Sequence, residues 1–141
     1  METHEFRKSE LNYGDVCRSL YGGQQFYYLT RDGFVEHSDI YTLTSGGNTA
    51  NTREQLECII ARNKLANVAK YFNNGWKPSN GDAYTTLEYF YGSGDVLAVP
   101  NVWHGESSYG QIIFKNEKDA WDAIKLLGIE TCKRAVMPLG V

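Results

Sequence analysis

The feature that most constrains this chain is one long helical stretch between residues 51 and 78. Thr52 followed by Gln55 fits a capping box, in which the Thr hydroxyl accepts a hydrogen bond from the backbone N–H of residue 55. Asn73-Asn74-Gly75 predicts a left-handed stop, and Pro78 prevents the helix from resuming. The pattern therefore predicts a helix of about 20 residues, or roughly 30 Å, from Thr52 to Asn74.

Apolar side chains recur through this helix at spacings of three and four, which places them on one face. They are Leu56, Ile59, Ile60, Leu65, Val68, Ala69 and Phe72. Residues 52–77 also carry five basic and two acidic groups, in a chain whose net charge is −3. Such a basic face is usually a solvated surface, and a patch for an anionic partner is the alternative interpretation.

Extended segments lie on both sides of the helix. Asp32-Gly33 separates two aromatic and β-branched runs, at 25–31 and 34–42, which is typical of a hairpin. Pro100 places its strand at an edge or a bulge. The other expected strands are 83–91, 96–103 and 110–115, and the other expected helices are 13–20, one between Asn116 and Gly128, and 129–136. The Gly-rich segment 44–49 is expected to be a flexible loop.

This order of elements predicts an α+β fold, in which an antiparallel sheet of hairpins packs against one long central helix and C-terminal helices. A chain of 141 residues is long enough for one domain with its own core, so a single domain over residues 1–141 is the expectation. Within it, residues 1–50 would form the N-terminal helix and hairpin. Residues 52–136 would form the central helix, the sheet and the C-terminal helices.

No catalytic or metal-binding pattern emerges from the residue types and their spacing. The histidines are His4, His37 and His104, and none lies in a nucleophile motif. His104-Gly105-Glu106 pairs a His with a carboxylate, but a polar hairpin loop explains it more simply. A zinc site needs closely paired His or Cys ligands, which the chain lacks. We therefore expect neither an enzyme nor a bound cofactor or metal.

The cysteine content and the hydropathy of the chain indicate its cellular compartment. Cys17, Cys58 and Cys132 are an odd, scattered set, which argues against a disulfide framework and for a reducing compartment. Cys58 and Cys132 have apolar neighbours and are expected in the core. No apolar run approaches the roughly 18 residues of a membrane span, and the N-terminus lacks a signal-peptide core. A cytoplasmic location without membrane contact is the expectation.

The composition is rich in side chains that suit binding surfaces, with ten Tyr and three Trp. Several of them fall in 78–110, a segment with four acidic and no basic residues, which disfavours direct DNA binding. Core packing is the alternative role for these aromatic residues. The candidate partner-binding residues are Arg62, Lys70, Trp76, Lys77, Tyr84, Tyr89, Tyr91 and Trp103.

The segment TREQLECIIARNKLANVAKYFNNGWKPSNGD, followed by TLEYFYGSGD and SYGQIIFKNEKDAWDAIKLLG, resembles a group of small uncharacterised proteins of gut Bacteroidetes genomes, phages and prophages. The resemblance covers roughly residues 52–136. Gly75-Trp76-Lys77-Pro78 and the Ile113-Phe114-Lys115 junction are its most specific parts. No activity is assigned to the group, so no catalytic residue can be carried over.

The resemblance implies a phage or mobile-element context. Small proteins of such elements often bind a host defence component, as anti-CRISPR proteins do. We therefore expect a non-enzymatic protein that inhibits a host protein or protein–nucleic-acid complex, most specifically a Cas9-type nuclease. One alternative is a protein that sequesters a nucleotide signal, for which Arg62, Lys70, Lys77 and Trp76 are available. A second is a virion or assembly accessory protein.

Overall fold

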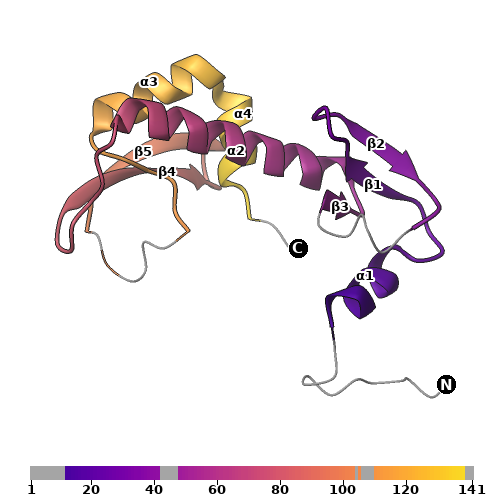
Figure 1. Ribbon diagram of the computed structural model, residues 1–141. Coiled ribbons are helices and arrows are strands. Elements are labelled where there is room, and N and C mark those ends of the chain that lie inside the picture. The colour runs from indigo at the N-terminus through magenta and orange to yellow at the C-terminus, as the bar shows by residue number, and fades with distance from the viewer. Residues whose placement is uncertain (1–11, 42–47, 104, 106–109, 139–141) are drawn as a thin grey trace. The chain divides into compact units, whose positions relative to one another are not determined.

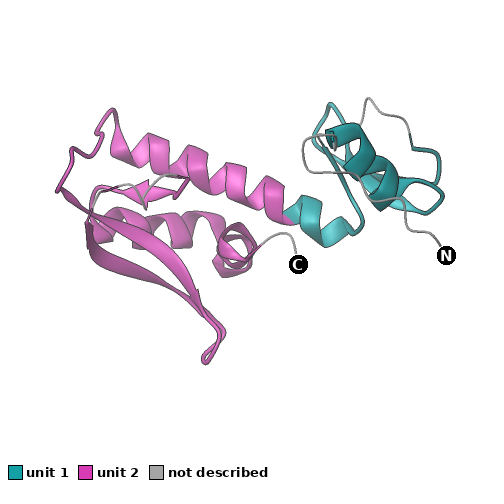
Figure 2. Cartoon of the chain, turned by 90° about the horizontal axis from the view of Figure 1, so that it is seen from below, with its two compact units in different colours: residues 1–57 teal, residues 58–141 magenta. Residues whose placement is uncertain are grey.

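Figure 1 shows the computed structural model, which describes residues 12–41, 48–103, 105 and 110–138. The described residues form four helices and two three-stranded antiparallel sheets, so the fold class is α+β, as predicted. The chain divides into two compact units, residues 1–57 and 58–141 (Figure 2). The expectation of a single domain stays a prediction. The expectation of one sheet is wrong, because the described strands form two separate sheets, one in each unit.

In the first unit, helix α1 (Tyr13–Tyr21) begins at a complete capping box. The Asn12 side chain accepts a hydrogen bond from the backbone N–H of Asp15 at 3.1 Å, and the Asp15 carboxylate accepts one from the Asn12 N–H at 3.2 Å. Cys17, Tyr21 and Phe26 are buried and form the core of this unit. The helix expected over residues 13–20 is confirmed, with one further residue at its end.

The sheet of the first unit contains β1 (Phe26–Leu29), β2 (Val35–Ser38) and β3 (Thr49–Ala50), in the order β2-β1-β3. The predicted hairpin is confirmed with shorter strands, and Gly33 in its turn has a φ of 88°. The expected loop 44–49 is partly wrong, because Thr49 belongs to β3. Its carbonyl accepts a hydrogen bond from the Tyr21 hydroxyl at 2.9 Å. Residues 42–47 lie outside the described residues.

Helix α2 (Arg53–Asn73) has 21 residues and ends where the sequence predicts. The backbone N–H of Gln55 donates to the Thr52 hydroxyl at 3.2 Å. Asn74 and Gly75 follow with φ values of 45° and 86°, which is the left-handed stop. The predicted apolar face needs one correction: Ile59 is exposed, whereas Ala61 is buried. Two residues correspond to about 200° around a helix, so these two positions lie on opposite sides.

The sheet of the second unit contains β4 (Ala83–Phe90), β5 (Asp95–Trp103) and β6 (Ile113–Phe114), in the order β5-β4-β6. The register shifts between Tyr84↔Val102 and Thr86↔Val99, so β5 has one extra residue there. Asn101 has a φ of 61° at this point. The bulge predicted from Pro100 is therefore confirmed, and β5 is an edge strand. The sixth strand is shorter than the expected 110–115.

Helices α3 (Glu117–Leu127) and α4 (Ile129–Val136) complete the second unit. The Asn116 side chain caps α3 by accepting from the backbone N–H of Asp119 at 2.8 Å. Trp121 on α3 is partly exposed, and its indole N–H donates to the Glu117 carboxylate at 3.3 Å.

The core of the second unit lies between one face of its sheet and the three helices (Figure 1). Its buried members are Ala61, Leu65, Ala69, Leu87, Val96, Phe114, Ala120, Ala123, Cys132 and Ala135. Cys58 and Cys132 are buried, as predicted. Small side chains on all three helices let the backbones approach the sheet closely.

Candidate functional site

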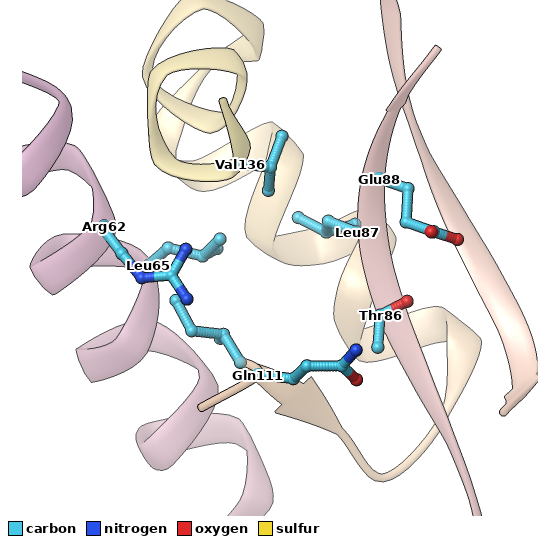
Figure 3. Close-up of a pocket in the computed structure, with 8 residues that line it drawn as sticks. Arg62, Leu65, Thr86, Leu87, Glu88, Gln111 and Val136 are labelled. Atoms are coloured by element: carbon cyan, nitrogen blue, oxygen red, sulfur yellow. The ribbon is translucent and has the colours of Figure 1, made fainter. Parts of the chain in front are cut away.

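Arg62 was expected on an outer, partner-binding face of α2, and the structure gives it a structural role instead. Its guanidinium donates to the carbonyl oxygen of Ala135 at 3.2 Å and to that of Gly110 at 2.8 Å. Figure 3 shows the guanidinium pointing into a cavity of ≈ 130 Å³ that Leu65 and Gln111 also line. Arg62 therefore joins α2 to the last turn of α4 and to the segment before β6, and it is withdrawn from the binding residues.

Replacing Arg62 by Lys is expected to lower the free energy of unfolding by about 1–2 kcal/mol, because one ammonium cannot reproduce a fork that reaches two carbonyls. Chemical denaturation measures the change. Lys64→Ala, at an exposed position on the same helix, is the control and should change the free energy by less than about 0.5 kcal/mol. Equal stability of Arg62→Lys and the wild type would show that the positive charge alone matters.

Three of the predicted binding residues come together at the end of α2. Lys70, Trp76 and Lys77 line a surface cavity of ≈ 350 Å³, together with Gln111 and the Ile113 region of β6. The stop at Asn74-Gly75 reverses the chain and returns Trp76 toward the helix, where its backbone N–H donates to the Asn73 carbonyl at 2.9 Å. We call this the Trp76 cavity. No carboxylate is among the described residues that line it.

A hydrogen-bond network behind the Trp76 cavity fixes the end of α2 to β6. The Asn73 side chain donates to the Ile113 carbonyl at 2.9 Å and accepts from the Lys115 N–H at 3.0 Å, which extends the edge of β6 as a strand would. The Lys115 ammonium donates to the Phe72 carbonyl and forms an ion pair with Asp119 at 2.5 Å. The Asn73 amide and the Lys115 ammonium thus hold the end of α2 against β6, which together form a wall of the Trp76 cavity.

Tyr84 was predicted to bind a partner, and its burial corrects that prediction. Its side chain is 2% exposed, and its hydroxyl donates to the Gln111 side chain at 2.9 Å. Tyr89 is half-buried on the core side of the sheet, with the Lys133 ammonium 5.8 Å from its ring centre. Tyr91 lies beyond the strand, 72% exposed, with its ring edge-on to Tyr89 at 4.8 Å. Only Tyr91 of the three presents most of its ring to solvent.

Cross-strand pairing identifies the face of the sheet that the helices leave uncovered. Residues directly opposite one another in an antiparallel pair lie on the same face. Leu87↔Ala98 and Tyr89↔Val96 both face the core. The pair Glu88↔Leu97 lies between them, and Phe90↔Asp95 follows at the end of the strands; both point to the other side, which we call the outer face. Figure 3 shows the Glu88 carboxylate directed away from Arg62.

The outer face combines apolar and acidic side chains. Phe90 and Leu97 are 42% and 38% exposed, although both are large and apolar. Glu88 and Asp95 are exposed beside them. The sequence analysis did not single out Phe90 and Leu97. Because side chains alternate between the two faces of a strand, the order of residues along 86–90 and 95–99 could have identified this face.

Trp103 is separated from the other aromatic candidates. It pairs with Ala83, at the opposite end of β4 from Phe90, and is 67% exposed. Seven residues of strand span roughly 23 Å, so Trp103 and Tyr91 are too far apart to contact one small ligand. The eight predicted residues therefore divide into the Trp76 cavity, the tip of the β4–β5 hairpin, an isolated Trp103, and the two corrected positions, Arg62 and Tyr84.

Reactive groups among the described residues show no catalytic arrangement. Burial raises the pKa of the Cys132 thiol, which disfavours the thiolate that a nucleophile requires. The described residues contain no cluster of His, Cys, Asp and Glu suited to a metal ion. His104 and Glu106, the His–carboxylate pair considered from the sequence, lie outside the described residues.

Comparison of the chain with protein-family models, with curated proteins and with solved structures gives no match. In the ranges that the structure describes, no helix combines the length and the apolar character needed to cross a bilayer. The outer face and the Trp76 cavity are therefore the two candidate sites of this chain.

Proposed function

We propose that this chain is a non-enzymatic inhibitor that acts by occluding a protein partner, and that the outer face of the β4–β5 hairpin is its contact surface. The partner is a host defence component, in the most specific form a Cas9-type nuclease bound to its guide. The observation that carries the proposal is the exposure of Phe90 and Leu97 on a sheet face that none of the described helices covers.

Exposed aromatic and aliphatic side chains on a rigid strand pair suit a protein contact. Interfaces are enriched in aromatic residues, and a few such anchors supply most of the binding energy. Phe90 and Leu97 are grouped near the tip of one hairpin, where the pairing of β4 with β5 fixes their positions. Preorganised anchors lose little conformational entropy on binding.

The charge of this surface indicates the kind of partner. Glu88 and Asp95 flank the apolar side chains, and residues 78–110 contain no Lys or Arg. An acidic rim favours a basic protein surface and repels nucleic acid phosphates. Proteins that bind nucleic acid carry basic surfaces, which agrees with a nuclease as the partner.

The phage origin, the bacterial cytoplasm as location and the choice of a Cas9-type nuclease come from the resemblance of residues 52–136 to small phage and prophage proteins. Of the two alternative functions, nucleotide binding gains a structural basis in the Trp76 cavity. Nothing in the described residues bears on a virion role.

A plasmid-cleavage assay tests the proposal. Purified protein in excess over a Cas9–guide complex is expected to leave the plasmid uncut, and order of addition shows whether inhibition precedes or follows DNA binding. Complete cleavage at excess protein would contradict the Cas9 assignment. A defence-competent host lysate passed over the immobilised protein tests the broader proposal, with Phe90→Ala/Leu97→Ala as the matched control, which should retain none of the specific partner.

A further inference from the structure

We propose that the Trp76 cavity is a nucleotide-binding site, in which the base stacks on the Trp76 indole and the phosphates are held by Lys70 and Lys77. This site does not involve the outer face, so it goes beyond the inhibitor function. The cavity is ≈ 350 Å³, which lies within the 300–1,000 Å³ range typical of small-molecule sites. Ala66 and Ala69 form its helix wall and leave the indole as its largest ring.

The charge of the cavity favours an anion. Lys70 and Lys77 both line it, and the described residues around it include no carboxylate. Within the part of the chain that the structure describes, no ion pair engages either lysine. Two unpaired ammonium groups at one opening attract phosphate, to which Lys donates charge-assisted hydrogen bonds.

The end of a helix carries partial negative charge, which would oppose an anion at this place. Here the last carbonyls already accept hydrogen bonds. The Asn74 N–H donates to the Lys70 backbone carbonyl at 3.2 Å, the Trp76 N–H donates to the Asn73 carbonyl, and the Lys115 ammonium donates to the Phe72 carbonyl. Because the chain itself satisfies these carbonyls, the charges of Lys70 and Lys77 remain available to a ligand.

The Trp76 indole provides a surface on which the base of a nucleotide can stack. Trp76 is half-buried, so one part of the ring is packed and the rest borders the cavity. Stacking of a base on an aromatic side chain contributes roughly 1–3 kcal/mol and tolerates any base. Gln111 adds an amide, although its oxygen already accepts from Tyr84. A nucleotide can contact both Trp76 and the two lysines. A nucleoside would contact Trp76 alone, and inorganic phosphate would contact the lysines alone.

Nuclear magnetic resonance on the full-length ¹⁵N-labelled chain tests the site, because the three tryptophans give three indole N–H signals. ATP and a cyclic dinucleotide are titrated at physiological salt, alongside adenosine and inorganic phosphate. A nucleotide is expected to shift the Trp76 indole signal and leave those of Trp103 and Trp121 in place. Adenosine and phosphate should bind at least about tenfold more weakly.

Lys70→Glu/Lys77→Glu is expected to weaken nucleotide binding by more than about tenfold, and Lys64→Glu, on the same helix but away from the cavity, should leave it unchanged. Unaltered Trp103 and Trp121 signals show that each variant is folded. The proposal is overturned if millimolar nucleotide leaves the Trp76 signal in place, if Lys64→Glu weakens binding equally, or if phosphate alone binds as tightly as the nucleotides. Loss of Cas9 inhibition does not affect this test.

Discussion

Replacing Phe90 and Leu97 together by Ala is expected to weaken inhibition of the partner by about 100-fold. Each side chain is large, apolar and partly exposed on the outer face, so each can act as an anchor whose truncation removes about 1.4 kcal/mol of binding free energy, or a factor of ten. The measurement is the concentration of protein that halves plasmid cleavage. Adding Tyr91→Ala should change inhibition little further, because the Tyr91 ring contacts Tyr89, which faces the core side of the sheet.

The matched control is Leu126→Ala/Ile129→Ala, which removes two exposed apolar side chains from α3 and α4 of the same unit. It should inhibit like the wild type. Trp103→Ala tests the other end of the hairpin and is also expected to have little effect on inhibition. If the α3/α4 control loses as much inhibition as the Phe90/Leu97 variant, the contact surface lies on the helices. If only Trp103→Ala loses inhibition, the open end of the hairpin is the contact.

Asn73→Ala is expected to lower the free energy of unfolding by about 2 kcal/mol. The change removes a donor to the Ile113 carbonyl and an acceptor from the Lys115 N–H, so two backbone groups of the β6 segment lose their partners. Urea denaturation of the full chain measures the loss. Faster hydrogen exchange should be concentrated at Lys115, whose amide loses its acceptor.

Asn63→Ala is the control, since Asn63 is exposed on the same helix and Ala is the better helix former. Its stability should equal or slightly exceed that of the wild type. Asn73→Asp distinguishes the two bonds, because Asp retains an acceptor for Lys115 but cannot donate to Ile113. If Asn73→Ala is as stable as Asn63→Ala, the side-chain bridge to β6 contributes nothing and the junction depends on packing alone.

Local rules predicted the parts of this fold that depend on neighbouring residues. The cap at Thr52, the stop at Gly75 and the bulge near Pro100 all act within a few positions, and each is present. Ile59 was wrongly assigned to the buried face because it is apolar, whereas the buried position on that side of the helix is taken by Ala61. Periodicity counts apolar residues and gives little weight to Ala, although small side chains decide where backbones approach.

Contacts between distant positions explain the remaining errors. Arg62 is 73 residues from Ala135 and 48 from Gly110, so no pattern along the chain shows that its charge is engaged. Tyr84 likewise finds Gln111 only after β4 and the segment before β6 come together. The gathering of Lys70, Trp76 and Lys77 was predictable, because a helix and its stop bring residues within eight positions close together.

The bulge in β5 has a consequence for which contacts the exposed edge of this sheet allows. An edge strand with unpaired amides can accept a strand from another molecule and begin a fibril. Pro100 lacks an N–H, and the left-handed backbone at Asn101 turns the edge away from a regular ladder. Another chain therefore cannot extend this sheet along the whole of β5. The outer face can still contact a protein partner with a complementary surface, whereas the addition of a strand from another copy of the chain along this edge is disfavoured.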